Sequence, residues 1–90
     1  MILEIERSSQ FKKDYKRLKR QGADLSKLLD VINRLVAEEI LDRHYLDHEL
    51  RGNWRGYREC HLEPDWLLIY KIERETLRLG RTGSHSDLFG

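Results

Sequence analysis

The sequence of 90 residues contains one cysteine, Cys60, and one proline, Pro64. A single cysteine excludes an internal disulfide and is typical of a protein from a reducing cytoplasm. No stretch approaches the ~18 consecutive apolar residues that a membrane helix requires. The first residues lack the basic and apolar regions of a signal peptide. We therefore expect a cytoplasmic protein that does not contact a membrane.

The motifs of several enzyme classes are also missing. The sequence has no GxSxG elbow, no P-loop, no GxGxxG fingerprint and no HExxH zinc signature. His44 and His48 have the spacing of zinc ligands on a helix, but no glutamate follows His44. Cys60 and His61 are neighbours on a predicted strand, so they would point to opposite faces. We expect no metal and no other cofactor, and we interpret Cys60 as a buried structural residue.

The chain is long enough for one small domain over residues 1–90. Its residues are 39% hydrophobic and 37% charged. The net charge of +1 hides a local excess, because residues 11–20 include six basic side chains and one acidic side chain. This basic helix face predicts contact with RNA or the ribosome. The alternative is an ordinary solvated face. The candidate contact residues are Lys12, Lys13, Lys16 and Arg17.

Two amphipathic helices are predicted in the N-terminal half, after a short strand over residues 2–6. Ser8 or Ser9 offers an N-cap oxygen to the first helix, and Gly22 can end it in a left-handed conformation. Asp24 can cap the second helix. Its apolar stripe consists of Leu25, Leu28, Leu29, Ile32, Leu35 and Val36. Residues 38–52 lose this periodicity and are predicted to be mostly loop.

The C-terminal half alternates in the manner of strands, which are predicted over residues 57–62, 66–70 and 76–82. A turn over residues 63–65 and a polar connection over residues 73–75 separate them. Residues 83–86 are predicted to be a mobile exit. The predicted fold class is α+β: a small antiparallel sheet with a helical hairpin on one face, in the order β-α-α-β-β-β.

Residues capable of acid–base and phosphate chemistry flank these strands. His61 ends one strand and Asp65 lies in the next turn, so we expect them at one edge of the sheet. Arg81 and His85 bracket the end of the last strand, and His48 lies in the long loop. Whether all of them meet depends on strand order, which the sequence does not determine. The alternative is a set of scattered surface histidines.

This inventory fits metal-free cleavage of RNA. Such a reaction needs a base for the ribose 2′-OH, an acid for the departing 5′-oxygen and a cation for the charge on phosphorus. Histidine can serve as base or acid near neutral pH, and arginine can bind phosphate oxygens as a fork. Because the 2′-OH is an internal nucleophile, no serine or cysteine nucleophile is needed.

Strict alternation places Arg81 on the same side as Leu77 and Leu79, which we assign to the core. Either a bulge at Gly80 redirects Arg81, or the apolar face opens into a site at the strand end.

Aromatic side chains provide a second indication. Trp66 and Phe89 are candidates for stacking on unpaired bases. For Trp54 and Tyr57 we favour a place in the core.

Three blocks of the sequence are similar to the YafQ-type toxins of the RelE superfamily, which belong to bacterial type II toxin–antitoxin systems. They read Asp47-His48-x-Leu50-x-Gly52, Gly56-Tyr57-Arg58-Glu59-Cys60-His61-Leu62-x-Pro64-Asp65-Trp66-Leu67-Leu68-Ile69-Tyr70 and Arg81-Thr82-Gly83-Ser84-His85-Ser86-x-Leu88-Phe89. The resemblance extends over essentially the whole chain, including its length and element order.

The resemblance implies a ribosome-dependent mRNA endonuclease, or mRNA interferase, that cuts the codon in the ribosomal A site. It also implies a cognate antitoxin protein, and contact with operator DNA only through the toxin–antitoxin complex. The implied active-site residues are His48, His61, Asp65, Arg81 and His85. Trp66 and Phe89 match aromatic positions that are also linked to activity in the family.

Our working hypothesis makes His85 the general acid and Arg81 the group that stabilises charge on phosphorus. His48, His61 and Asp65 share the roles of base and orienting group, and the base is not assigned to one of them. The alternative functions are a non-catalytic nucleic-acid-binding regulator and a partner-binding domain. No helix-turn-helix or ribbon reader supports the first of these.

Overall fold

The N-terminal helices begin at the predicted caps. The computed structural model describes residues 1–90. Helix α1 (Ser9–Arg20) starts after Ser8, whose hydroxyl accepts a hydrogen bond from the Phe11 amide at 2.9 Å. The chain leaves α1 through Gly22, which has a φ of 75° as a left-handed helix end requires. Helix α2 (Leu25–Val36) starts after Asp24, whose carboxylate accepts from the Ser26 amide.

A five-stranded sheet in the order β1-β5-β4-β3-β2 forms the rest of the framework. Strands β3 (Arg58–Glu63), β4 (Trp66–Glu73) and β5 (Thr76–Gly83) form the predicted antiparallel meander. Strand β1 (Glu4–Arg7) pairs in parallel with β5 at the edge of the meander, although both helices and strands β2, β3 and β4 lie between them in the sequence. The sheet is therefore mostly, but not wholly, antiparallel.

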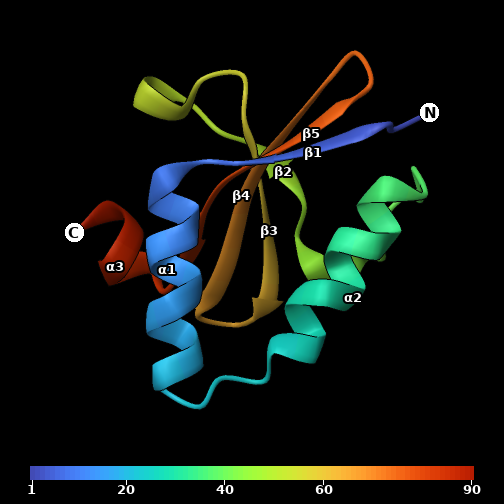
Figure 1. The fold of residues 1–90 in the computed structure, drawn as a ribbon. Helices are drawn as coiled ribbons and strands as arrows, with labels where there is room; N and C mark the ends of the chain where they lie inside the picture. Colours follow the sequence, from blue (N-terminus) through green and yellow to red (C-terminus); the bar gives the residue numbers. More distant parts are fainter.

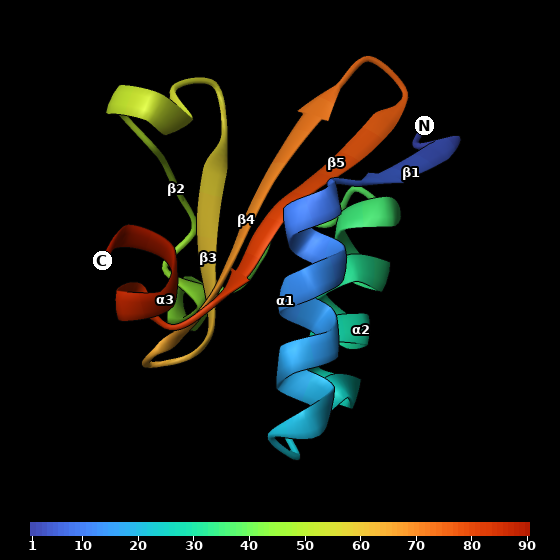
Figure 2. The ribbon, with the colours of Figure 1, turned by 60° about the vertical axis from the view of Figure 1, so that its left-hand side comes forward.

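The helices lie on opposite faces of the sheet. Figure 2 shows α1 and α2 on one face and the short helix α3 (His85–Phe89) on the other. On the shared face, α1 lies against β5 and α2 against β3, so the two helices cover different parts of the sheet (Figure 1). The face opposite α1 and α2 is called the open face below. It is only partly covered, by α3 and by the loop before β3.

Strand β4 supplies the core on both faces. Leu68 and Tyr70 pack with residues of α1 and α2, whereas Leu67 and Ile69 pack with Leu88 of α3. Leu67, Leu68 and Ile69 are fully buried. This explains the continuous apolar run, since a central strand buries both of its faces. Truncating one of these leucines to alanine would cost about 2–5 kcal/mol of stability.

Two segments differ from the sequence prediction. The predicted mobile exit is instead the cap of α3: the Ser84 hydroxyl accepts from the Asp87 amide, and the Asp87 carboxylate accepts from the Ser84 amide. The long loop contains a two-residue strand, β2 (His48–Glu49), flanked by 3₁₀ turns over Arg43–Tyr45 and Gly52–Trp54. None of the helices combines the length and the apolar character needed to cross a membrane.

Cys60 lies in the helix-side core and is fully buried, in agreement with its predicted structural role. Burial raises the pKa of its thiol to about 12, so almost no thiolate is present near pH 8. We expect iodoacetamide to leave Cys60 unmodified in the native protein at pH 8 and to alkylate it readily in denaturant. Mass spectrometry measures this difference, and rapid alkylation of the native protein would contradict the assignment.

Candidate functional site

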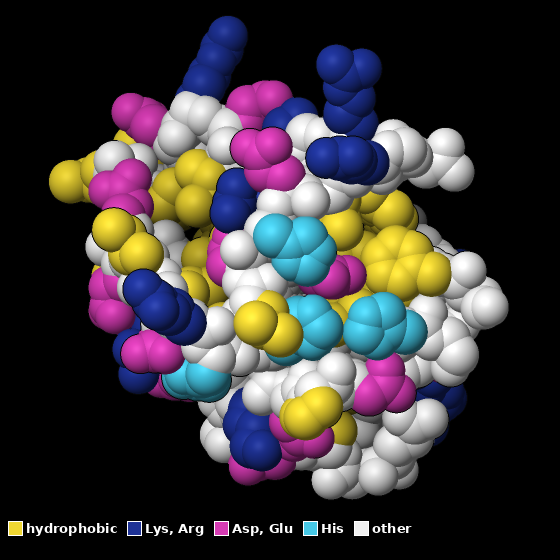
Figure 3. All heavy atoms as spheres, turned by 180° about the vertical axis from the view of Figure 1, so that it is seen from behind, with side chains coloured by type: hydrophobic (Ala, Val, Ile, Leu, Met, Phe, Trp, Pro, Cys, Tyr) yellow, Lys and Arg dark blue, Asp and Glu magenta, His cyan; other side chains and the backbone are white.

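The candidate site lies on the open face of the sheet. Strand pairing places His48, Glu59, Ile69 and Arg81 in one row across β2, β3, β4 and β5. Directly paired residues of antiparallel strands share a face. His61 lies two residues further along β3 and thus on the same face. Figure 3 shows histidine side chains gathered around acidic groups there.

Glu59 is a site residue that the sequence analysis did not select. Its side chain is 6% exposed and lies between two imidazoles. The Glu59 Oε2 atom is 3.2 Å from the His48 Nε2 atom and 3.5 Å from the His61 Nε2 atom. The available signal was its position two residues before His61, since this spacing puts both side chains on one face of a strand.

Backbone carbonyls fix the tautomers of these two histidines. The Nδ1 atom of His48 is 2.8 Å from the Leu46 carbonyl oxygen, and the Nδ1 atom of His61 is 3.3 Å from the Pro64 carbonyl oxygen. A carbonyl only accepts, so both Nδ1 atoms carry the proton and both Nε2 atoms face Glu59. A carboxylate does not face two imidazole lone pairs favourably. A proton on either Nε2 atom would therefore lie between an imidazole and the Glu59 carboxylate.

The third histidine is held by the turn between β3 and β4. His85 is the first residue of α3, and both its backbone amide and its Nδ1 atom lie 3.0 Å from the Asp65 Oδ1 atom. The hydrogen bonds from the His85 amide and ring lower the pKa of Asp65. With Nδ1 bound to Asp65, the Nε2 atom of His85 stays available. The His85 ring lies 5.7 Å from the His61 ring and 6.3 Å from the Phe89 ring.

A bulge determines the position of Arg81. Ile69 pairs with Arg81 and the adjacent Tyr70 pairs with Leu79, so Gly80 is the extra residue of β5. The bulge moves Arg81 off the core side and onto the open face, which is the first of the two alternatives that the sequence left. The space at Gly80 is tight, because a Cβ atom there would lie 3.2 Å from the Trp54 ring and 3.3 Å from the Tyr57 ring.

Arg81 does not hydrogen-bond to any of the histidines. Its Nε and Nη2 atoms donate to the Asp14 carboxylate of α1, at 3.0 and 2.8 Å. The structure therefore brings His48, His61 and His85 together around Glu59, and Asp65 binds His85 at the rim of this group. Arg81 shares the row of Glu59 and His48 but directs its side chain toward α1.

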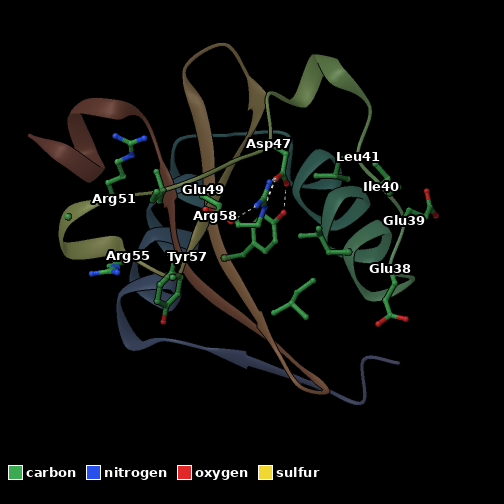
Figure 4. Close-up of a pocket in the computed structure, with 16 residues that line it drawn as sticks. Glu38, Glu39, Ile40, Leu41, Asp47, Glu49, Arg51, Arg55, Tyr57 and Arg58 are labelled. Carbon is green, nitrogen blue, oxygen red and sulfur yellow. Dashed lines mark hydrogen bonds and ion pairs between the residues drawn. The ribbon is translucent and has the colours of Figure 1, made fainter.

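A polar network fixes the two-residue strand that carries His48. The carboxylate of Asp47 accepts hydrogen bonds from the Arg58 Nε atom at 2.6 Å and from the Tyr70 hydroxyl. Burial and the Asp47 charge raise the pKa of Tyr70, so its hydroxyl remains a donor. Figure 4 shows this network in the wall of a groove of about 1090 Å³ between the end of α2 and β3. No histidine lines that groove, so it is separate from the candidate site.

Three of the clustered groups could hold a metal ion. The ligand atoms of Glu59, His61 and His85 lie within 4.8 Å of one another. This is wider than the roughly 3.3 Å between two ligand atoms on tetrahedral zinc with bonds near 2.05 Å, so a small closure would be required. His44, which the sequence pairs with His48 by spacing, binds Asp42 instead.

Comparison with known proteins gives consistent results. A family model described as the bacterial toxin of type II toxin–antitoxin systems, YafQ, matches residues 3–90. The chain belongs to the YafQ family of toxins. The mRNA interferase toxin YafQ of Escherichia coli K12 is 44% identical over 88 residues, which cover 97% of this chain and 96% of that protein.

Solved structures agree in fold as well. The E. coli DinJ–YafQ toxin–antitoxin complex contains a chain that matches with a TM-score of 0.92 and 43% identity, with complete coverage of both chains. A metal-bound toxin from Helicobacter pylori matches with a TM-score of 0.90 and 48% identity, covering 98% of this chain and 100% of that chain. The α+β fold predicted from the sequence is confirmed.

The aromatic residues that the sequence suggested for base stacking differ in exposure in this YafQ-family chain. Trp66 is 6% exposed in the helix-side core, where its Nε1 atom donates to the Thr82 hydroxyl at 2.9 Å. The prediction that it stacks on a base is wrong for this conformation, because its ring is enclosed. Phe89 is 50% exposed beside His85 and stays a stacking candidate. Trp54 and Tyr57 pack against the core on the open face, as predicted.

The basic residues of α1 differ among themselves. Lys12, Lys13 and Lys16 are exposed. Arg17 is not free: its guanidinium donates to Asp14 at 2.9 Å and to the Thr82 carbonyl at 3.3 Å, and lies 3.5 Å from Asp87. These contacts hold it between α1, β5 and α3, but its side chain is 26% exposed, so its assignment as an RNA contact stays a prediction.

Proposed function

We propose that this chain is a ribosome-dependent mRNA endonuclease, an mRNA interferase that cuts mRNA in the ribosomal A site and so inhibits translation. The observation that supports this most strongly is the meeting of His48, His61 and His85 around Glu59 on an exposed face of the sheet. The name of the E. coli relative, an mRNA interferase toxin, supports the same activity.

The proposed reaction uses the ribose 2′-OH as its nucleophile. The group formed by Glu59, His48 and His61 takes the 2′-OH proton, and the 2′-oxygen forms a bond to phosphorus. The bond from phosphorus to the 5′-oxygen breaks, and the Nε2–H of His85 donates its proton to that oxygen. The products are a 2′,3′-cyclic phosphate and a free 5′-OH. No oxidant, reductant or metal enters this balance.

Other groups bind the substrate in this proposal. Arg81 stabilises the negative charge that develops on phosphorus. Phe89 stacks on an unpaired base beside His85, an interaction worth about 1–3 kcal/mol. Asp65 keeps the imidazole of His85 in one orientation, through the two hydrogen bonds at 3.0 Å. Trp66 contributes indirectly, because it supports the turn that contains Asp65.

The proposed partners follow from the same assignment. A cognate antitoxin protein neutralises the toxin, as the E. coli DinJ–YafQ complex suggests for a relative. Operator DNA is contacted only through the toxin–antitoxin complex. Because its substrate is mRNA on ribosomes, the toxin acts in the cytoplasm.

The test maps mRNA 5′ ends on ribosomes before and after a short pulse of the protein. We expect new 5′ ends within the A-site codon, at the same position of the codon in different mRNAs. They should be absent when the cognate antitoxin is produced together with the toxin. An unchanged set of 5′ ends, or new ends without relation to the reading frame, would contradict the proposal.

Lysines on opposite flanks of α1 provide a prediction about ribosome binding. Asp14 and Arg17 contact β5 and α3, so Lys13, one turn before Arg17, lies on the flank nearest the site. Lys12 lies on the other flank. We expect Lys13→Ala to reduce the slope of log affinity against log salt by about 0.7–0.9 and Lys12→Ala to change it little. Ribosome association measured over a salt series gives this slope, and equal effects would contradict the assignment.

Metal binding should inhibit the proposed reaction, because it would occupy the proton-carrying atoms of Glu59, His61 and His85. A related toxin from H. pylori has been solved with a metal bound. We predict that micromolar zinc slows cleavage, that a zinc chelator restores it and that His61→Ala weakens zinc binding measured by calorimetry. His44→Ala is the control and should bind zinc as the unmodified protein does. Faster cleavage in zinc would exclude this interpretation.

A further inference from the structure

Asp14 is a buried charged residue to which the proposed reaction gives no role. Its side chain is 1% exposed where α1 meets β5. Four donors reach its two oxygens: Arg81 through Nε at 3.0 Å and Nη2 at 2.8 Å, Arg17 through Nη1 at 2.9 Å and the Thr82 amide at 3.2 Å. A buried carboxylate is costly unless it is paired and hydrogen-bonded in this way.

The carboxylate of Asp14 stays charged in this environment. Burial by itself would raise its pKa, but the hydrogen bonds from Arg81, Thr82 and Arg17 outweigh burial and lower the pKa. The same bonds fix one edge of the Arg81 guanidinium, the edge that carries Nε and Nη2. The Nη1 atom of Arg81 has no partner within the protein. This leaves one end of the fork free to donate to a ligand.

Asp14 is also connected to the helix that carries His85. Arg17, which shares the Asp14 carboxylate, lies 3.5 Å from Asp87, and Asp87 closes the capping box of α3. Arg17 passes close to the backbone of Gly83 to reach Asp87, because a Cβ atom at Gly83 would lie 2.7 Å from the Arg17 Nη2 atom. One carboxylate of α1 thus fixes Arg81 directly and α3 through Arg17.

We propose that Asp14 is a positioning residue for RNA cleavage, which holds one edge of the Arg81 guanidinium so that the free Nη1 donors meet a phosphate at the β5 edge of the sheet. This inference rests on the proposed function. Arg81 shares its row with Glu59, two strands away, which corresponds to about 10 Å between their Cα atoms. Arg81 then binds the phosphate while Glu59 and the imidazoles handle the 2′-OH proton. Asp14 touches neither substrate nor reacting atoms.

Chemical rescue separates positioning from a purely structural role. Arg81→Ala should slow single-turnover cleavage of ribosome-bound mRNA by about 100-fold. Guanidinium chloride at tens of millimolar should restore part of this rate, at least about 10-fold, by binding to Asp14 in the vacated space. In the double variant Arg81→Ala/Asp14→Asn it should restore nothing. Asp14→Asn alone should lower the maximal rate without changing the substrate concentration at half saturation.

The control for charge removal is Asp30→Asn, because Asp30 is an exposed residue of α2 paired with Arg34. It should cleave at the unmodified rate. Equal rescue of the single and double variants, or full activity of Asp14→Asn, would overturn the inference while cleavage by the unmodified protein still supports the proposed function. No cleavage by the unmodified protein would instead overturn the proposed function.

If Asp14→Asn does not fold, two rescuing ions can be compared in the Arg81→Ala variant alone. Guanidinium, a planar fork, should rescue with saturation, whereas methylammonium at the same concentration should not. Rescue by both ions to the same extent, or by neither, would contradict a site in which Asp14 binds one edge of a guanidinium group.

Discussion

Replacing His85 with alanine is expected to slow single-turnover cleavage of ribosome-bound mRNA by at least about 100-fold. Its Nδ1 atom and backbone amide are bound to Asp65, so the Nε2 atom is the part of the ring that is free to give a proton to the 5′-oxygen. Alanine keeps the backbone hydrogen bond to Asp65 and can start α3 equally well. The loss should therefore appear in the chemical step, with ribosome binding unchanged.

His44→Ala is the matched control for this prediction. His44 is exposed and pairs with Asp42, away from the clustered histidines. It should leave both cleavage and binding unchanged. If His85→Ala cleaves at nearly the unmodified rate, His85 is not the general acid. If it fails to bind ribosomes, the loss of cleavage would have a different cause from the one proposed.

Glu59→Gln is expected to have an effect of similar size, about 100-fold on the cleavage rate. Glutamine preserves the shape of a side chain that is 6% exposed, but it replaces the carboxylate that faces the His48 and His61 Nε2 atoms with a neutral amide. The substitution should also change the shape of the pH–rate profile, because the group that takes the 2′-OH proton is altered. A purely structural role would leave the shape of that profile unchanged.

Glu63→Gln is the control for this second substitution. Glu63 lies at the end of the same strand but is exposed and pairs with Lys27. Its removal should leave the cleavage rate and the pH profile as they are. An active Glu59→Gln variant with an unchanged profile would assign the base to a histidine acting without the carboxylate.

Local signals were sufficient for most of the fold. Ser8 and Asp24 carry side-chain oxygens that cap helices, and both do so in the structure. The apolar run from Trp66 to Tyr70 indicated a strand buried on both faces, which is the place that β4 takes. Helix α3 could also have been recognised, because Ser84 and Asp87 have the spacing of a capping box.

The parts of the site that were missed depend on long-range pairing. Glu59 becomes a site residue only because β2 pairs with β3 and brings His48 opposite it. The position of Arg81 depends on a bulge that the register of β4 and β5 reveals. Trp66 could be placed on a face by alternation, but its burial depends on what α1 and α2 cover. No pattern in the sequence indicated that Asp14 and Arg81 meet across 67 positions.

The role of the ribose hydroxyl can be tested on a single bond. An mRNA with one 2′-deoxynucleotide on the 5′ side of the cut should bind in the A site of ribosomes and resist cleavage by the toxin. The unmodified mRNA should yield a 2′,3′-cyclic phosphate and a 5′-OH, which mass spectrometry distinguishes from other ends. Cleavage of the deoxy-substituted bond, or a 5′-phosphate on the downstream fragment, would contradict internal attack directed by Glu59 and the clustered histidines.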